Sequence, residues 1–407
     1  MSKPELKQKR NSYEVYWAEE KVKTILERIK NNGRGLHAEI SVFDEDNLIL
    51  TPSSITLSSQ ASREKIIKVL NTQSRRPDWT QLILAACEKV SQAYREGEPC
   101  VEVWSHEVAK PISYLLHPLI IEEQPNFLYG RGGTKKSYLA LLIAICLRLP
   151  WKDNLFGWKT LDYGIASLYL DWEASENEFR WRLHRLATGL DLPTVPIHYV
   201  RMISPLEDET EKIGKIIEEN KIGFIVIDSL AAACGGNLKE TQEALGFFRA
   251  LRSLKTTALI IAHTSKEKGE DKTIYGNVFF ENYGRNNWET RAQQEFGTNS
   301  SQTALFHRKA NNSMLFNPIG LEFAFAEDGV IITKVEVSET PLSSNLPMHM
   351  QITELLQQFK VMTTNEIAEE LGKDTSKEKE VVKTTLYRDK QRFVRVGDGW
   401  GLRYKEG

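Results

Sequence analysis

The sequence has few of the features that mark secreted or membrane proteins. It contains only four cysteines in 407 residues, scattered without a CxxC pair or a nearby group of histidines. This spacing argues against a disulfide framework and a structural zinc site, and it fits a reducing cytoplasm. The N-terminus is polar, and the longest apolar run, residues 138–149, is interrupted by Arg148 and too short to span a bilayer. We therefore expect a cytoplasmic protein without membrane contact.

The charges of the chain are also balanced. The 53 Lys and Arg residues against 55 Asp and Glu residues leave a formal charge of -2. Binding of nucleic acid would therefore need a local basic patch rather than a basic surface overall. The composition, 41% hydrophobic and 27% charged, is that of a globular protein. Because domains usually hold about 100–200 residues each, the length allows roughly two or three of them.

The first hundred residues predict a small α+β domain. Apolar positions in residues 12–30 recur at helical spacing and predict a helix, whereas residues 36–43 alternate as a strand. Two further helical patterns follow at residues 62–70 and 79–94, before the loop 95–99 breaks the periodicity. We place this domain at residues 1–98 and expect it to contact a protein partner or to support oligomerisation.

The middle of the chain has the pattern of an α/β fold. Short apolar runs alternate with amphipathic segments that are long enough for the crossover helices of a parallel sheet. We predict a mainly parallel, RecA-like sheet with helices on both faces at residues 99–338, and antiparallel strands added to one edge after residue 303. The apolar runs lie at residues 127–129, 167–170, 197–200, 224–227 and 258–261.

The strongest candidate site is a glycine-rich loop between an apolar strand and an amphipathic helix. Residues 130–137 read GRGGTKKS, so Lys135 stands where the phosphate-loop pattern GxxxxGK[ST] has its second glycine. Glycines let backbone N–H groups close around phosphate oxygens, and the N-terminus of the following helix attracts them. The alternative is a glycine-rich turn without a ligand. We expect ATP and Mg²⁺ to bind through Gly130, Gly132, Gly133, Thr134, Lys135, Lys136, Ser137 and Tyr138.

Polar residues at the ends of three apolar runs complete this candidate site. Asp228 can orient Mg²⁺ through water, together with the hydroxyl of Ser137, although an aspartate there can equally cap a helix. Glu173 can polarise the attacking water, or it is a solvated acid at a helix start. His263 can sense the γ-phosphate, but a lone histidine is more often a structural hydrogen-bonding group. Lys136 can reach the β and γ phosphates.

The order of these motifs resembles that of the RecA-like P-loop ATPases, most closely the hexameric plasmid-replication helicase family RepA. The resemblance covers about residues 111–325. It rests on FLYGRGGTKKSYLALLIA, SLYLDWEASENEFRWRL, GFIVIDSLAA and LIIAHTSKE, which begin at residues 127, 167, 223 and 259. It implies a homo-oligomeric ring or filament in which Glu173 is the base and Lys136, Asp228 and His263 contact the phosphates or the metal. It also implies that Arg308 and Lys309 reach into the neighbouring subunit's nucleotide; the alternative is that they are charges that protect an exposed strand edge.

The C-terminal part predicts a separate unit that carries the basic patch. Residues 339–347 are rich in Ser and Pro and read as a linker, and residues 348–407 predict three helices closed by a hairpin, as in a winged helix-turn-helix domain. Residues 377–407 hold nine Lys or Arg against five acids. Winged helices also bind proteins, so DNA is one of two alternatives. The candidate DNA contacts are Lys383, Thr384, Tyr387, Arg388, Arg392 and Arg395.

Two functions follow as expectations. The first is an ATP-hydrolysing, helicase-like motor or loader that acts on DNA in replication, recombination, a mobile element or defence. The second is a DNA-binding assembly or regulatory protein that uses ATP as a switch with little turnover, because Lys135 can hinder the turn of the loop. Hydrolysis of ATP distinguishes the two. A third possibility is a structural subunit whose P-loop fold is vestigial, which nucleotide bound at residues 130–137 would exclude.

Overall fold

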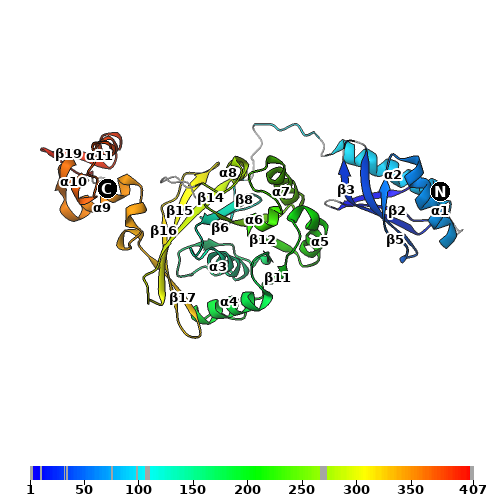
Figure 1. Ribbon diagram of the computed structural model, residues 1–407, viewed down its shortest axis with the longest axis horizontal. Helices are drawn as coiled ribbons and strands as arrows, with labels where there is room; N and C mark the ends of the chain where they lie inside the picture. Colours follow the sequence, from blue (N-terminus) through cyan, green and yellow to red (C-terminus); the bar gives the residue numbers. More distant parts are fainter. Residues whose placement is uncertain are drawn as a thin grey trace. The chain divides into compact units, whose positions relative to one another are not determined.

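The computed structural model describes residues 3–9, 12–31, 33, 35–74, 77–97, 100–105, 111–265 and 273–403 (Figure 1). The chain divides into two compact units. The first comprises Met1–Pro111, Ser204–Ile222 and Gln242–Thr256, and the second comprises Ile112–Ile203, Gly223–Thr241 and Thr257–Gly407. The division into domains at residues 1–98, 99–338 and 348–407 stays a prediction.

The first unit contains an antiparallel five-stranded sheet in the order β1-β2-β3-β4-β5. Its N-terminal elements are β1 (Glu5–Lys9), β2 (Ser12–Trp17), β3 (Val22–Asn31), β4 (Leu36–Asp44), β5 (Asn47–Thr56), α1 (Gln60–Gln73) and α2 (Trp79–Glu96). The strand and the two helices predicted at residues 36–94 are confirmed.

The helix predicted for residues 12–30 is wrong, because this segment forms strands β2 and β3. Tyr13, Val15 and Trp17 are buried in alternation along β2, and Val22 and Leu26 are buried along β3. Some apolar residues of this segment are spaced two positions apart and others three or four, so the pattern fits a strand as well as a helix. Pairing with β4 and packing against α1 and α2 select the strand period.

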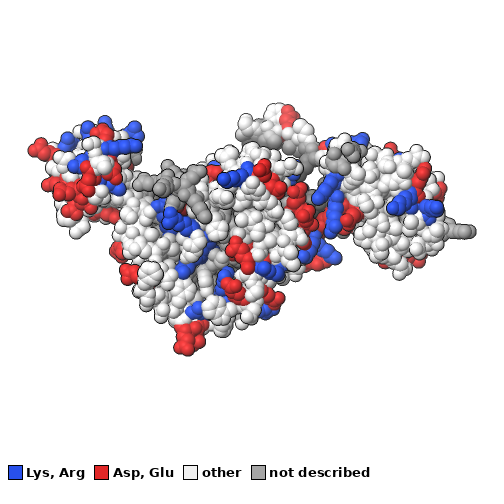
Figure 2. All heavy atoms as spheres, viewed as in Figure 1, with Lys and Arg blue, Asp and Glu red and all other residues white. Residues whose placement is uncertain are grey.

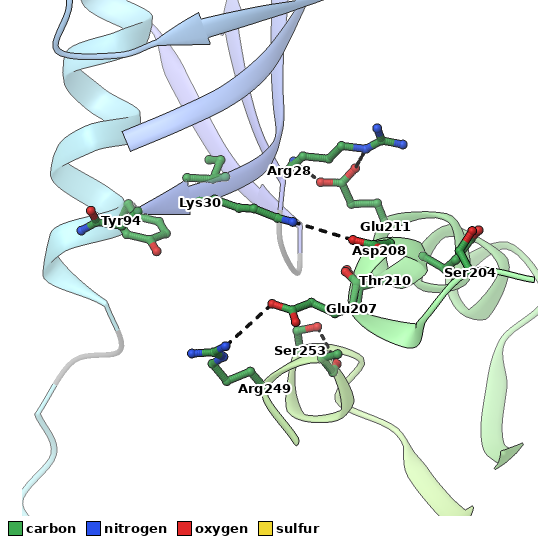
Figure 3. A pocket seen from close by; sticks show the side chains of 14 residues that line it. Arg28, Lys30, Tyr94, Ser204, Glu207, Asp208, Thr210, Glu211, Arg249 and Ser253 are labelled. Carbon is green, nitrogen blue, oxygen red and sulfur yellow. Dashed lines mark hydrogen bonds and ion pairs between the residues drawn. The ribbon is translucent and has the colours of Figure 1, made fainter. Parts of the chain in front are cut away.

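Helices α5 (Leu206–Glu219) and α7 (Thr241–Ser253) also belong to the first unit. Figure 3 shows Lys30 of β3 pointing toward Asp208 of α5, with Arg28 beside Glu211. Lys30 Nζ lies 3.9 Å from Asp208 Oδ1, and Arg28 Nε lies 3.4 Å from Glu211 Oε2. Three of these four side chains are more than half exposed. Exposed ion pairs contribute about 0–1 kcal/mol each, so they stabilise this contact weakly.

The second unit is built on a nine-stranded sheet in the order β11-β10-β12-β13-β8-β14-β15-β16-β17. The pairs β10–β11, β12–β13, β13–β8 and β8–β14 are parallel, and β15, β16 and β17 continue the sheet as antiparallel strands. The predicted α/β fold, mainly parallel with an antiparallel edge, is confirmed. The strands are β8 (Pro125–Gly130), β10 (Ala166–Asp171), β11 (His198–Arg201), β12 (Ile222–Asp228), β13 (Thr257–His263), β14 (Asn286–Gln293), β15 (Ser300–Ala310), β16 (Ile319–Phe325) and β17 (Val330–Val335).

Short elements and helices connect these strands. Helix α3 (Lys136–Arg148) follows β8 directly and is buried along most of its length, because its apolar residues pack into the main core of the unit. That burial fixes the position of the loop before it. The remaining elements are β6 (Tyr114–His117), β7 (Ile120–Ile121), β9 (Lys159–Thr160), α4 (Glu176–Gly189), α6 (Leu230–Cys234) and α8 (Val278–Tyr283).

The segment predicted as a linker at residues 339–347 is partly folded. It begins at the end of one short 3₁₀ turn, η1 (Val337–Glu339), and contains a second, η2 (Ser343–Asn345). Leu342 and Leu346 are buried against Phe306 of β15. The Ser and Pro content suggested an extended linker, but two leucines four residues apart anchor this stretch to the sheet.

Beyond this segment lie α9 (Met348–Phe359), α10 (Thr364–Glu370) and α11 (Ser376–Arg388), with a three-stranded sheet in the order β18-β20-β19. The strands are β18 (Val361–Met362), β19 (Phe393–Val396) and β20 (Gly399–Leu402). Thr363 and Thr375 each begin a helix with a capping box. The three predicted helices and the hairpin are confirmed as elements.

Candidate nucleotide-binding site

The loop between β8 and α3 is held in place by strand β14. Thr134 Oγ1 lies 2.8 Å from Thr290 Oγ1, in a buried hydrogen bond. A Cβ on Gly130 would overlap the side chain and the backbone oxygen of Thr290, so only glycine fits there. Gly133 has φ +80°, which favours glycine, whereas a Cβ on Gly132 would meet nothing within 4 Å. Glycine is therefore required at position 130 by lack of space and favoured at position 133 by the backbone conformation.

Lys135 has a left-handed backbone conformation, which favours glycine. Its φ of 62° and ψ of 20° lie in the left-handed region. Its ammonium lies 4.9 Å from the ring centroid of Phe325, and Nζ lies 3.4 Å from Gln294 Oε1. Burial lowers the pKa of Lys135. The side chain is thus engaged by β16 and by the residue after β14.

Lys136 begins helix α3 and is almost fully buried. Its Nζ donates to the backbone oxygens of Gly130 at 3.1 Å and Arg131 at 2.7 Å. Burial lowers the pKa of Lys136 to about 8, and the carboxylates of Asp228 and Glu173 oppose this shift. An ammonium held by loop carbonyls can exchange these weak acceptors for phosphate oxygens, which are stronger partners.

Asp228 ends strand β12, two strands away from β8, and is 3% exposed. Tyr169 donates its hydroxyl hydrogen to Asp228 Oδ2 over 2.6 Å, and the hydroxyl of Ser137 is also hydrogen-bonded to this carboxylate. Burial raises the pKa of Asp228 to about 6, while these two hydrogen bonds oppose the rise. The structure thus brings together the two residues predicted to hold the metal.

The hydroxyl and the carboxylate suit Mg²⁺ bound with a nucleotide. In a phosphate-binding loop, Mg²⁺ is held by one hydroxyl, phosphate oxygens and waters, with an acid behind a water. Among the residues that the structure describes, no three His, Cys, Asp or Glu side chains form a separate metal cluster. Ser137 and Asp228 would hold the ion, which would offset charge on the β and γ phosphates.

Glu173 follows β10 and reaches the same edge of the sheet. Its carboxylate accepts a hydrogen bond from the hydroxyl of Ser229, the residue after Asp228. Asp171 Oδ1 accepts the backbone N–H groups of Glu173 at 2.9 Å and Ala174 at 2.8 Å, which fixes the turn that carries Glu173. The side chain of Glu173 is exposed, as a residue that meets a water molecule requires.

His263 ends strand β13 beside the loop. It pairs in register with Gly130 of β8, and its ring is hydrogen-bonded to the backbone there. Burial and the charge of Lys136 lower the pKa of His263. Tyr138, one position past Ser137, is half-buried, with its ring centroid 5.8 Å from that of Phe325.

Arg308 and Lys309 lie on β15 and bind partners within the same chain. Arg308 Nε lies 2.9 Å from Oε2 of the buried Glu289, which also accepts from Arg291 Nε at 2.9 Å. Lys309 Nζ donates to the backbone oxygen of Asn282 at 3.0 Å. A role in a neighbouring subunit would require these cations to leave their partners.

Three contacts at this site were not predicted from sequence, namely those of Tyr169, Ser229 and Thr290. Tyr169 lies inside an apolar strand, where nothing marks it as polar in function, and Thr290 lies far from the loop in sequence. Ser229 could have been suspected, because it directly follows Asp228. A cavity of about 320 Å³ adjoins the loop and is lined by Arg131, Gly132, Gly133, Thr134, Thr264, Glu289, Thr290, Arg291, Ala292, Gln294, Ser301, Leu342 and Asn345.

A comparison with known families agrees with this geometry. Residues 98–269 match the family model described as AAA domain. This segment is a P-loop NTPase domain, of a kind that generally binds ATP with Mg²⁺. No curated protein matches the chain. Among the described residues, none of the helices combines the length and the apolar character needed to cross a bilayer.

The candidate DNA contacts lie on α11 and around β19. Lys383, Tyr387 and Arg388 of α11 are exposed, whereas Thr384 is half-buried. Arg392 lies 3.5 Å from Asp389 in an ion pair, and Arg395 is stacked with its guanidinium 5.0 Å from the ring centroid of Trp400. Figure 2 shows acidic and basic side chains together on this part of the chain. This part of the chain is therefore not basic over the whole face that the figure shows.

Proposed function

We propose that the protein is an ATP-hydrolysing, helicase-like motor or loader that acts on DNA as a homo-oligomer. The observation that carries the ATPase part of the proposal is that Lys136, Asp228 and Glu173 lie together at one edge of a parallel sheet, next to a phosphate-binding loop. Lys136 would bind the β and γ phosphates, and Asp228 with Ser137 would hold Mg²⁺. Glu173 would accept a proton from the attacking water. His263 would contact the γ-phosphate.

Hydrolysis in the presence of DNA tests this proposal. We expect ATP turnover that rises when single- or double-stranded DNA is added, and loss of nucleotide binding in Lys136→Ala. The matched control is Lys152→Ala, which removes a lysine whose side chain is 67% exposed and paired with Asp162. Nucleotide binding that is the same in Lys136→Ala and in the wild type would refute the assignment of the loop.

DNA contact is proposed for the C-terminal part. Three helices followed by a hairpin, with Lys383, Tyr387 and Arg388 exposed on α11, resemble a winged helix-turn-helix, in which such a helix enters the major groove. Arg392 and Arg395 would contact phosphates, and Thr384 a base edge. The N-terminal domain would supply a protein contact.

An oligomer in which Arg308 or Lys309 acts on a neighbouring nucleotide can be tested by mixing two inactive variants. Glu173→Gln lacks the base, and Arg308→Ala lacks the cation. If the cation acts between subunits, mixed assemblies contain some interfaces with both groups intact, and part of the turnover returns. If Arg308 only balances the buried Glu289 within its own chain, mixing restores nothing.

The second candidate, a DNA-binding assembly or regulatory protein that uses ATP as a switch, rests on Lys135. A loop that departs from its pattern can bind ATP and turn it over slowly. Against this candidate stands the backbone of Lys135, which adopts a left-handed conformation that favours glycine, so the side chain does not prevent the turn. DNA-stimulated hydrolysis that disappears in Glu173→Gln would exclude the switch.

A further inference from the structure

The two acids at the edge of the sheet are each held by a hydroxyl from the other acid's strand. Tyr169 of β10 donates to Asp228 of β12 at 2.6 Å. In return, Ser229, which follows β12, donates to Glu173, which follows β10. Because β10 and β12 are neighbours in the sheet, the two hydrogen bonds cross between the same pair of strands. A backbone bond from Trp172 N to Asp228 O, 2.8 Å long, lies between them.

Three of the four side chains in these two hydrogen bonds are buried. Tyr169 is 2% exposed, Asp228 3% and Ser229 1%. A hydrogen bond to a carboxylate is stronger in such a desolvated place than at the surface, and a buried carboxylate that loses a donor is poorly compensated. Tyr169 therefore holds Oδ2 of Asp228 in place, while the hydroxyl of Ser137 is also hydrogen-bonded to this carboxylate.

Glu173 is in a different situation, because its side chain is exposed. An exposed glutamate samples many rotamers when nothing holds it. The bond from Ser229 engages one carboxylate oxygen and leaves the other available. A base that is fixed in this way keeps its free oxygen near one place, as proton transfer from a bound water requires.

We propose that Tyr169 and Ser229 are positioning residues, with Tyr169 fixing Asp228 for the Mg²⁺ shell and Ser229 fixing Glu173 for the attacking water. This inference rests on the proposed function and names two further residues of the same site. Each acts through the acid to which it donates.

The two residues have separable effects. Tyr169→Phe removes a single oxygen and should raise the Mg²⁺ concentration needed for half-maximal ATP binding about tenfold, while affinity for ATP without Mg²⁺ stays unchanged. Ser229→Ala should lower kcat about tenfold and leave KM and the Mg²⁺ requirement unchanged. A fluorescent ATP analogue, titrated with and without Mg²⁺ on the full chain, gives the binding values independently of turnover.

Two controls separate positioning from general damage. Tyr199→Phe removes a tyrosine hydroxyl from the adjoining strand β11, where it donates to the backbone oxygen of Ala174 at 3.2 Å, and should leave the Mg²⁺ requirement unchanged. In an Asp228→Asn background, Tyr169→Phe should add no further change in the Mg²⁺ requirement, because the carboxylate it positions is already gone. Thermal unfolding of each variant shows that it is folded.

Several results would overturn the inference. One is a Tyr169→Phe variant that binds ATP equally weakly with and without Mg²⁺, and another is an unchanged Mg²⁺ requirement in a folded variant. A Ser229→Ala variant with wild-type kcat would remove Ser229 from the scheme. By contrast, a wild-type chain that binds no ATP at all would overturn the proposed function itself.

Discussion

Replacement of Lys135 by glycine tests whether this residue hinders the site. The structure places Lys135 at φ 62°, where a residue with a side chain has an unfavourable energy of roughly 1–2 kcal/mol. Glycine removes this strain. Against that gain, glycine loses the contact of the ammonium with Phe325, about 0.5–1 kcal/mol, and makes the unfolded chain more flexible, which costs roughly 0.5–1 kcal/mol.

These contributions nearly cancel. We expect the free energy of unfolding of Lys135→Gly to differ from that of the wild type by about 1 kcal/mol or less. Because the side chain lies over Phe325 and not at the edge that holds Asp228, nucleotide affinity and turnover should each stay within about threefold. Chemical denaturation, titration with a fluorescent ATP analogue and a steady-state ATPase assay measure the three quantities.

Lys135→Val provides the matched contrast. Valine loses the same contact with Phe325, but its β-branched side chain tolerates the left-handed region poorly. We expect the loop to distort, with ATP affinity reduced at least tenfold, which corresponds to about 1.4 kcal/mol. If Lys135→Gly instead raises turnover tenfold or more, Lys135 obstructs hydrolysis and the switch becomes the better function. If Lys135→Gly abolishes binding, its ammonium contacts phosphate.

Three further predictions concern the loop, the core and the C-terminal part. Gly130→Ala should abolish ATP binding, because a Cβ there overlaps Thr290, whereas Gly132→Ala, measured in the same titration, should bind normally. His307 is buried, and burial lowers its pKa to about 4. Between pH 6.5 and 4 the unfolded chain therefore binds more protons than the folded chain, so the free energy of unfolding decreases by up to about 3 kcal/mol as the pH is lowered across this range. In His307→Asn, chemical denaturation at several pH values should show a free energy of unfolding that depends less on pH over this range than in the wild type. An equal pH dependence in the two proteins would show that His307 does not titrate in this way. If about four phosphates are neutralised, the log-log dependence of DNA affinity on salt should have a slope near -3.6, and Arg388→Ala should make it about one unit shallower. An unchanged slope would place the DNA elsewhere.

The sequence carries much of the information about the sheet edge. In parallel strands the carboxyl ends align, so Asp228 and His263, which follow apolar runs, lie at the same edge of the sheet as the loop, and their roles stay predictions. The sequence pattern also marked the glycines of the loop, of which Gly130 and Gly133 have a structural reason. What the pattern could not show is how Lys135 is accommodated, because a φ value and a contact with Phe325 are tertiary properties.

Other features depend on contacts between residues far apart in sequence. Tyr169 and Ser229 acquire their partners only when β10 and β12 become neighbours, and Arg308 meets Glu289 only when β14 and β15 pair. The strands β2 and β3 were mistaken for a helix, because a short apolar segment can satisfy both periods. Tertiary packing decides such cases, and a single sequence does not reveal it.

We propose that the sheet edge with Lys136, Asp228 and Glu173 hydrolyses ATP. Comparison of the wild type with Glu173→Gln, in ATP binding and in turnover on the same preparation, tests it most directly. We predict that Glu173→Gln binds Mg²⁺-ATP within about threefold of the wild type and turns it over at least roughly a hundredfold more slowly, since it keeps the phosphate and metal contacts but loses the base. Equal turnover by the two proteins would contradict the claim.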